Sequence, residues 1–338
     1  MRKLATIRKI DAINPIEGAD AIEVATVGGW KVVVKKGEFA VGDLAVYFEI
    51  DSWIPTSLAP FLSKGKEPHE YEGVKGERLR TIKLRGQISQ GLLLPIGAID
   101  DGKFHPEYLD DGFDLTELLG IKKWEKPIHP QLRGMVRGNF PTQIPKTDQE
   151  RVQNLVKEIA NGGIFEVTEK LEGSSMTVYR IKGEFGVCSR NLDLKRDENN
   201  AFWKVAVRDK IDEKMQAIDP YWDFAIQGEL IGPSIQGNIY GLKDVEFHVF
   251  DVYDIQAGDY LAPDARRALI RKMELVHVPV LNNGFVLDGQ TVDELLIMAE
   301  GLSQIGMDCQ REGIVFKEVN GGFTFKAVSN RYLLNSKE

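Results

Sequence analysis

The chain has 338 residues, which is long enough for two domains because one compact domain usually has about 100 to 200 residues. A hydrophobic share of 43% and a charged share of 28% exclude a disordered or fibrous protein. The formal net charge of -8 excludes nucleic-acid binding through a general positive charge, so any such binding must use local basic patches.

The sequence has no sign of a membrane or disulfide-rich protein. No apolar run approaches the roughly 18 residues of a membrane-spanning helix, and charged residues interrupt the apolar stretch at the amino end. We therefore expect a cytoplasmic protein without a membrane partner. Cys188 and Cys309 are too few for a disulfide framework and lack metal-ligand spacing, so both are expected to be buried, reduced thiols. The histidines are scattered without pairing, which gives little support to a histidine metal centre.

Residues 1–125 are predicted to form a small β-barrel. Short strand-like runs are separated by glycine and acidic turns, and helical periodicity is weak throughout. Such a series of short strands suits a Greek-key barrel, and the OB-fold is the commonest barrel of this kind that binds oligonucleotides. The runs are 21–26, 30–35, 44–50, 80–84 and 91–95.

A basic patch in this barrel is the candidate nucleic-acid-binding site. A solvated charged face without a ligand is the alternative for any such run of charges. The segment from Arg80 to Leu92 resembles the corresponding stretch of tRNA-binding OB modules. The patch consists of Lys75, Arg78, Arg80, Lys83 and Arg85, and a second basic group consists of Lys122, Lys123, Lys126, Arg133 and Arg137.

Residues 126–146 are predicted to be a linker, and residues 147–338 a second domain. Prolines, glycines and basic residues replace regular periodicity in the linker. Thr147 and Glu150 form a capping-box pattern that predicts a helix at the start of the second domain, and a similar pattern at Thr291 predicts a later helix. Strand-like alternation between and after these positions indicates a mixed α and β domain.

A lysine in a strand-like run is the candidate nucleophile. The run 164–173 alternates, which is expected to place Phe165 on an apolar face and both Glu166 and Lys170 on a polar face. Gly173 follows, where we expect close approach of the backbone to a ligand to exclude a side chain. Taken alone, Lys-x-x-Gly is a weak pattern that also occurs by chance.

Further segments follow Lys170, and their order along the chain, more than any one of them, indicates a functional set. Each segment taken singly also fits a surface carboxylate, an ordinary core aromatic residue or a solvated lysine. The segments are Cys188-Ser-Arg190, Gln227-Gly-Glu-Leu-Ile231, Val249-Phe-Asp-Val-Tyr253, Glu312-Gly-Ile-Val-Phe-Lys317 and Phe325-Lys326. This ordered set resembles motifs I, Ia, III, IIIa, IV and V of the covalent nucleotidyltransferases, the superfamily of DNA ligases, RNA ligases and mRNA capping enzymes.

The closer resemblance is to RNA ligases of the Deinococcus type, because the barrel lies at the amino end and Ser329-Asn-Arg-Tyr332 follows Lys326. The resemblance implies an α+β fold in which an OB-like barrel precedes a nucleotidyltransferase domain of antiparallel sheets flanked by helices. It implies an ATP-dependent RNA ligase that seals 3′-OH/5′-phosphate nicks in duplex RNA or RNA–DNA hybrids through lysyl-AMP, with Mg²⁺ or Mn²⁺. It also implies that the 2′-hydroxyl is sensed on the 3′-hydroxyl strand.

The resemblance assigns a role to each motif residue. Lys170 would be the catalytic nucleophile, and Glu312 would bind the metal. Glu229 would bind the ribose hydroxyls, and Phe250 would stack on adenine, with Phe247 as the competing aromatic residue. The backbone carbonyl of Glu169 would accept from the adenine amino group. The complete nucleotide-binding set is Glu169, Lys170, Glu172, Arg190, Glu229, Phe250, Lys317 and Lys326.

The nucleophile needs a suitable pocket. A lysine with a reference pKa of ~10.4 is a poor nucleophile, so we expect desolvation or cations such as Lys326 and Arg190 to favour the neutral amine. Val328 stands where phage-type relatives carry a second lysine, and Ser175 where they carry asparagine, so a phosphate contact is expected to pass to Lys317. The alternatives are a DNA ligase and a catalytically silent RNA-binding protein with the ligase fold.

Overall fold

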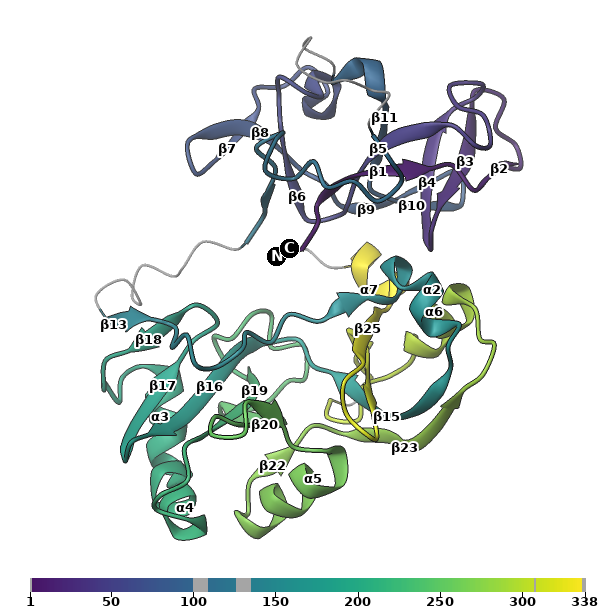
Figure 1. The fold of residues 1–338 in the computed structure, drawn as a ribbon. Coiled ribbons are helices and arrows are strands. Elements are labelled where there is room, and N and C mark those ends of the chain that lie inside the picture. The colour runs from purple at the N-terminus through teal and green to yellow at the C-terminus, as the bar shows by residue number, and fades with distance from the viewer. Residues whose placement is uncertain (1, 100–108, 126–134, 307, 336–338) are drawn as a thin grey trace. The chain divides into compact units, whose positions relative to one another are not determined.

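The computed structural model describes residues 2–99, 109–125, 135–306 and 308–335, which form two compact units (Figure 1). None of the helices in these ranges has the length and apolar character needed to span a bilayer. Cys188 is buried as expected, whereas Cys309 is half-buried, and both are free thiols. Unit 1 contains Met1–Pro127, Gln153–Val156 and Leu333–Glu338, and unit 2 contains Ile128–Val152 and Lys157–Tyr332.

Unit 1 is built from short, mostly antiparallel strands in the sheets β1-β5-β11, β2-β3-β4, β10-β9 and β12-β6-β8-β7. The five expected runs are confirmed as β3, β4, β5, β9 and β11. The elements are β1 Ala5–Lys9, β2 Ala12–Pro15, β3 Ile22–Val27, β4 Trp30–Lys35, β5 Leu44–Phe48, β6 Ser52–Pro55, η1 Pro60–Ser63, β7 His69–Tyr71, β8 Val74–Arg78, β9 Thr81–Leu84, β10 Gln87–Gln90, β11 Leu92–Pro95, η2 Ile96–Ala98 and β12 Lys122–Lys123.

Alternation explains why these runs form strands with a buried face. In β4, Trp30, Val32 and Val34 are buried, whereas Lys31 and Val33 between them are half-buried. Side chains of successive residues point to opposite sides of a strand, so one side of β4 joins the core. The same core contains Tyr47 of β5, whose ring centroid lies 5.8 Å from that of Trp30.

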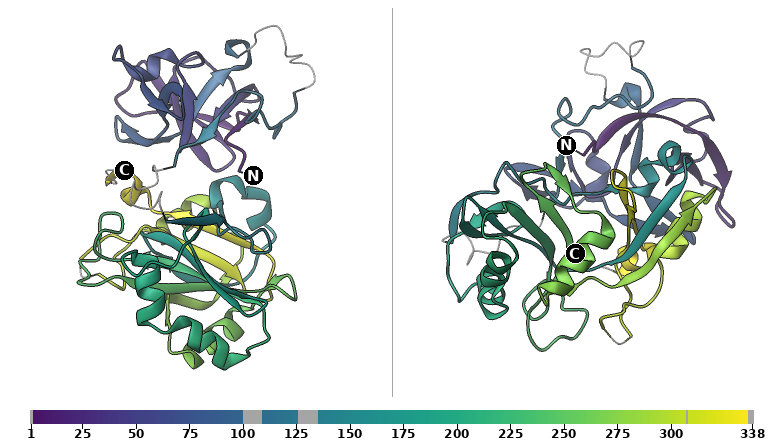
Figure 2. Two further views of the ribbon diagram at one scale, coloured as in Figure 1. Left: turned by 90° about the vertical axis from the view of Figure 1, so that its left-hand side faces the viewer. Right: turned by 60° about the horizontal axis from the view of Figure 1, so that its bottom comes forward.

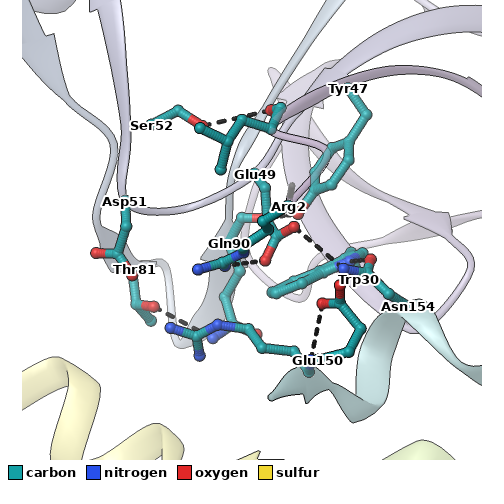
Figure 3. A network of polar contacts seen from close by, with 12 residues as sticks. Arg2, Trp30, Tyr47, Glu49, Asp51, Ser52, Thr81, Gln90, Glu150 and Asn154 are labelled. Atoms are coloured by element: carbon teal, nitrogen blue, oxygen red, sulfur yellow. Dashed lines mark hydrogen bonds and ion pairs between the residues drawn. The ribbon is translucent and has the colours of Figure 1, made fainter. Parts of the chain in front are cut away.

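Unit 1 also includes a short segment, Gln153–Val156, from the region predicted to belong to the second domain. The indole nitrogen of Trp30 donates to Oδ1 of Asn154 at 2.6 Å, and Nδ2 of Asn154 donates to Glu49 at 3.1 Å. Arg2 forms an ion pair with Glu49, so the buried carboxylate has a cationic and an amide partner (Figure 3). These contacts satisfy polar groups that would be costly to bury alone.

Unit 2 contains an eight-stranded sheet, ordered β13-β18-β17-β16-β19-β20-β21 with β22 beside β20, and a five-stranded sheet, ordered β14-β25-β24-β15-β23. Most pairs are antiparallel, while β14 with β25 and β20 with β22 are parallel. The strands are β13 Val136–Asn139, β14 Glu150–Arg151, β15 Gly163–Lys170, β16 Ser174–Ile181, β17 Glu184–Cys188, β18 Leu192–Leu194, β19 Phe224–Ile231, β20 Glu246–Asp254, β21 Asp259–Tyr260, β22 Val276–His277, β23 Val280–Leu287, β24 Gly313–Glu318 and β25 Thr324–Val328.

Helices cover the sheets of unit 2. Residues of α3, α4 and α5 share one apolar core with β16, β17, β19 and β20 (Figure 2). Helix α6 lies beside β24 and β25. The helices are η4 Val152–Asn154, α2 Val156–Ile159, α3 Ala201–Arg208, α4 Ile211–Ile218, α5 Pro263–Lys272, α6 Val292–Ala299 and α7 Asn330–Asn335. The predicted α+β architecture with antiparallel sheets and flanking helices is confirmed.

The two predicted helix starts have different outcomes. Thr291 and Glu294 form the expected capping box at the start of α6. The prediction at Thr147 is wrong, because the chain there leads into strand β14 and the Thr147 hydroxyl lies 3.1 Å from the Ser175 hydroxyl. Pairing of β14 with β25 therefore overrides a local capping pattern, which is common when tertiary contacts compete with weak propensities.

Candidate active site

Strand β15 carries the candidate nucleophile at its last position. It is hydrogen-bonded on both sides, to β23 and to β24. Because β15 is an inner strand, its polar face is covered: Glu166 and Thr168 are as buried as Phe165 on the apolar face. Lys170 itself is partly exposed, and its Cα lies opposite that of Gly313 in β24. The register therefore places the segments around Lys170 and Glu312 side by side.

Gly173 packs closely against the protein's own backbone. A Cβ at this position would lie 2.3 Å from the carbonyl oxygen of Leu230 and 2.9 Å from Cγ of Glu229. The structure therefore gives a packing reason for glycine here, and close approach to a ligand stays a prediction. Only a residue without a side chain lets the turn after Lys170 pack closely against β19.

Replacing Gly173 with alanine is expected to lower the free energy of unfolding by about 1 to 3 kcal/mol, because a methyl group would displace packed backbone. Urea denaturation of both proteins measures this change. Gly138→Ala is the matched control, because a Cβ at Gly138 meets no atom within 4 Å. Equal stability of the two variants would show that the turn can move aside without cost.

The amine of Lys170 is surrounded mainly by carboxylates. Its Nζ lies 2.7 Å from Oε1 of Glu312, with both side chains partly buried. Burial lowers the pKa of Lys170, but the charges of Glu312 and Glu229 and the hydrogen bond to Glu312 raise it by more, while Arg151 opposes them. The net pKa lies above its ordinary value. Desolvation and a cation thus act on the pKa in the expected direction, but the two acids outweigh them.

Glu229, on β19, is the second carboxylate of the site. Its pKa is raised to about 8, mainly by burial and also by the charge of Glu312, while Lys170 and Arg190 act to lower it. A carboxyl with such a pKa is poised to act as either hydrogen-bond donor or acceptor near neutral pH. Arg190 is exposed, and one of its terminal nitrogens donates to both oxygens of Asp148, at 2.7 and 2.9 Å.

Two cations come from the neighbouring pair of strands β14 and β25. Lys326 is half-buried, and its Cα lies opposite those of Val315 and Arg151. Arg151 is buried, and its charge acts on Lys170. Arg151 was not predicted from the sequence, because it lies in a two-residue strand whose local pattern suggested a helix. The pairing of β14 with β25 in the structure identifies it.

Phe250 occupies a β-bulge. In the pairing of β19 with β20, Gln227 lies opposite Asp251 and Gly228 opposite Val249, so Phe250 has no opposite residue. A bulge of this kind redirects a side chain and is frequent beside active sites. Phe247 instead belongs to the large apolar core, while half-buried Phe250 packs on a separate cluster that includes Leu171 and Tyr240.

Lys317 and Glu169 are buried in different surroundings, and Glu172 is half-buried. The Nζ of Lys317 lies 2.7 Å from Asp251, donates to the carbonyl of Phe250 at 2.5 Å and lies 5.3 Å from the centre of its ring. The carboxylate of Glu169 accepts from the backbone of Gln304 at 2.8 Å. The backbone N–H of Glu172 donates to the hydroxyl of Tyr240 at 2.6 Å.

The basic patch of unit 1 divides into paired and outward-facing cations. Lys75 pairs with Glu67 at 2.6 Å, while Arg78 pairs with Asp51 at 2.7 Å and lies 3.9 Å above the ring of Trp124. The other three residues are exposed on or beside the hairpin of β9 and β10, together with the apolar side chains of Ile82 and Leu84. These three residues are Arg80, Lys83 and Arg85.

The second basic group is less coherent. Lys122 pairs with Glu72 at 2.6 Å, and Lys123 lies 3.5 Å from Glu125. Arg137 belongs to unit 2, where it lies near Glu184 and Asp193 at 3.5 and 3.4 Å. Lys126 and Arg133 lie outside the described residues.

The chain combines a barrel of short strands with an α+β unit. In the α+β unit, a lysine at the end of a strand faces carboxylates and has cations nearby, which defines a ligase-type nucleotidyltransferase. Residues 4–96 match the model of an OB-fold domain, and residues 163–328 match the RNA ligase family model. The chain belongs to the RNA ligase family. The recognition from the sequence motifs, with the OB-fold before the ligase domain, is confirmed.

Solved structures of an RNA ligase from Naegleria gruberi are similar over the full length. A variant with AMP and Mn is 48% identical, with a TM-score of 0.91 and coverage of 98% of both chains. A structure with pyrophosphate is 48% identical, with a TM-score of 0.89 and coverage of 98% of both chains. A variant with ATP and Mn is 47% identical, with a TM-score of 0.91 and coverage of 100% of both chains. Comparison with curated proteins gave no match.

Proposed function

We propose that the chain is an ATP-dependent ligase that seals 3′-OH/5′-phosphate nicks in duplex RNA or RNA–DNA hybrids through a lysyl-AMP intermediate. The observation that carries this proposal is the position of Lys170, with its amine 2.7 Å from Glu312 at the end of β15 and Glu229 close enough to act on its charge. The similar ligase from Naegleria gruberi, solved with ATP, AMP and pyrophosphate, supports the same chemistry for this chain.

In the first step, the amine of Lys170 attacks the α-phosphate of ATP, a nitrogen–phosphorus bond forms and pyrophosphate leaves. The amine must first lose the proton that Glu312 now helps it to keep. Mg²⁺ or Mn²⁺ at Glu312 would share this carboxylate and neutralise phosphate charge, and such ions commonly bind through one or two carboxylates plus substrate phosphates. Lys326 and Arg151 supply positive charge for the phosphate in the transition state.

The remaining motif residues are proposed to bind the rest of ATP. Phe250, redirected by the bulge, stacks on adenine, and Glu229 binds the ribose hydroxyls. The backbone carbonyl of Glu169 accepts from the adenine amino group. Glu172 and Arg190 complete the nucleotide contacts, and Lys317 acts on the nucleotide through its bonds to Phe250 and Asp251.

In the second step, an oxygen of the RNA 5′-phosphate attacks the lysyl-AMP phosphorus, and AMP passes from Lys170 to the RNA. In the third, the 3′-hydroxyl attacks the activated phosphate and AMP leaves. We propose the OB-fold domain, residues 1–125, as the nucleic-acid-binding domain, joined by a linker at 126–146 to the adenylation domain at 147–338. An OB-fold suits this task because its strands and loops commonly bind oligonucleotides.

Incubation with ATP labelled in the α-phosphate, followed by denaturing electrophoresis, tests the proposed intermediate. A label that remains on the protein and disappears on addition of pyrophosphate is expected, because step one is reversible. Sealing is then measured on a nicked RNA duplex with the same preparation. Absence of the label in the presence of ATP and Mg²⁺ or Mn²⁺ would refute the lysyl-AMP route.

The exposed cations of the β9–β10 hairpin are expected to contact phosphates. Lys83→Ala with Arg85→Ala should weaken binding to a nicked duplex, and the plot of log affinity against log salt should become shallower by about 2. Fluorescence anisotropy at several salt concentrations measures both effects. Lys36→Ala is the control, because Lys36 is an exposed lysine of the same unit that lies outside the basic patch. An unchanged salt slope would remove the hairpin from the RNA site.

A further inference from the structure

A buried charge cluster lies beside the Phe250 bulge, and Arg266 at its centre has no role in the reaction described above. Three of its members are almost completely shielded from solvent: the side chain of Arg266 is 1% exposed, that of Glu166 0% and that of Lys317 5%. Buried charges are costly unless they are well paired, and such pairs often fail to add stability over apolar side chains of similar size. The cluster consists of Glu166, Asp251, Arg266, His277 and Lys317.

Arg266 of α5 is the centre of this buried charge cluster. Its guanidinium pairs with Glu166 on β15, donates to Nε2 of His277 at 3.1 Å and lies 3.4 Å from Asp251. His277 accepts this bond with one ring nitrogen, while its other ring nitrogen lies 2.7 Å from the carbonyl of Val278. A neutral imidazole with hydrogen on Nδ1 satisfies both contacts. The guanidinium therefore bridges two acids and one neutral ring.

The cluster joins the two sheets of unit 2 at the bulge. Glu166 and Lys317 are opposite residues in the five-stranded sheet, whereas Phe250 and Asp251 belong to β20 of the eight-stranded sheet. Asp251 forms ion pairs with Lys317 at 2.7 Å and with Arg266 at 3.4 Å. Lys317 also donates a hydrogen bond to the carbonyl of Phe250. The chain on the carboxyl side of Phe250 is thus held by charged groups.

We propose that Arg266 is a positioning residue for the adenine base, which it never touches, because it holds Asp251 and thereby the bulge that presents Phe250. This inference rests on the proposed function, in which Phe250 stacks on adenine. An unpaired bulge residue has no opposite strand residue to hold it, so its orientation must come from neighbouring contacts. Without the guanidinium, Lys317 is the one ion-pair partner that Asp251 keeps among the described residues, and the bulge gains freedom that ATP binding must remove.

The test replaces Arg266 with methionine in the full chain and measures single-turnover adenylation of the protein across ATP concentrations. The half-saturating ATP concentration is expected to rise about tenfold, the scale of a lost base–aromatic stack. The rate at saturating ATP is expected to stay within about twofold, because the groups around Lys170 are unchanged. A fall in the saturating rate with an unchanged half-saturating concentration would overturn the proposal.

Arg180→Met is the matched control. Arg180 is also a buried arginine of unit 2, ion-paired with Asp212, but it lies outside the buried charge cluster. Both variants are expected to lower the melting temperature, and only Arg266→Met should weaken ATP use. If both variants raise the half-saturating ATP concentration equally, the effect is general destabilisation and the proposal fails. If Arg266→Met does not fold, Arg266→Lys takes its place in the same comparison. Lysine keeps the positive charge but cannot bridge the two acids and the imidazole ring.

Phe250→Leu separates failure of this inference from failure of the proposed function. Phe250→Leu alone should raise the half-saturating ATP concentration, and adding Arg266→Met should then have little further effect, because the two residues act through one contact. No effect of Phe250→Leu would refute the adenine role itself. An effect of Phe250→Leu with additive effects in the double variant would keep the adenine role and overturn the positioning role of Arg266.

Discussion

Replacing Lys170 with alanine is expected to abolish the covalent protein–AMP adduct. Step one needs an amine beside the α-phosphate, and Lys170 is the lysine paired with Glu312 at the end of β15. The other motif lysine in the core, Lys317, is buried and bound to Asp251, so it cannot take over the attack. Labelled ATP and denaturing electrophoresis measure the loss directly.

Two controls make this result specific. Lys243→Ala removes an exposed lysine of the same unit and should leave adduct formation unchanged. The Lys170→Ala protein should still seal a strand that already carries AMP on its 5′-phosphate, because in step three AMP leaves from RNA and not from the protein. A labelled adduct in Lys170→Ala would refute the nucleophile assignment, and failure on the pre-adenylated strand would indicate a folding defect.

Local sequence patterns correctly predicted the strands of unit 1 and the start of helix α6. The strand runs of unit 1 alternate between core and periphery, as in β4, so the two-residue period reveals them. The capping box at Thr291 is a self-contained motif whose hydrogen bonds lie within a single helical turn. In each case, the information lies within a few neighbouring residues.

The features that shape the candidate site depend on partners distant in sequence. Alternation places Glu166 on the polar face of its strand, but β15 is an inner strand, and Glu166 is paired with Arg266 and Arg267, which lie one hundred or more residues away. The pKa of Lys170 rises because the carboxylates of Glu229 and Glu312 lie near its amine. No sequence pattern around position 170 indicates these two neighbours. The bulge at Phe250 likewise depends on the register with β19, and not on the sequence of β20.

The motif order still predicted which segments would meet. Lys170 and Glu312 are adjacent because β15 and β24 pair, and Lys326 follows on β25, the next strand of the same sheet. Arg151 was missed because β14 has only two residues and joins this sheet in parallel. A strand so short lacks any periodicity, so only tertiary pairing identifies it.

The sugar on the 3′-hydroxyl side of the nick is expected to decide whether sealing occurs. The 2′-hydroxyl is both donor and acceptor, and it favours A-form geometry near the break, so it lets a protein distinguish RNA from DNA at one site. A nick whose 3′-hydroxyl strand ends in ribonucleotides should be sealed even when the 5′-phosphate strand is DNA. A nick with DNA on the 3′-hydroxyl side should be sealed poorly. The sealing rate is expected to fall by one or more orders of magnitude if a polar group of the site is left unpaired, because an unpaired group costs about 1 to 3 kcal/mol.

Four duplexes with every combination of sugars at one nick allow this comparison under single-turnover conditions. Starting from pre-adenylated protein removes step one, so that differences arise only in AMP transfer and phosphodiester formation. A strand already carrying AMP on its 5′-phosphate then isolates step three, in which the 3′-hydroxyl itself reacts. If the preference for ribose persists with this strand, the 2′-hydroxyl acts on the attacking group; if it disappears, the sugar is sensed earlier, during AMP transfer. Equal rates for all four duplexes would refute the proposed RNA preference and favour a ligase that accepts DNA equally.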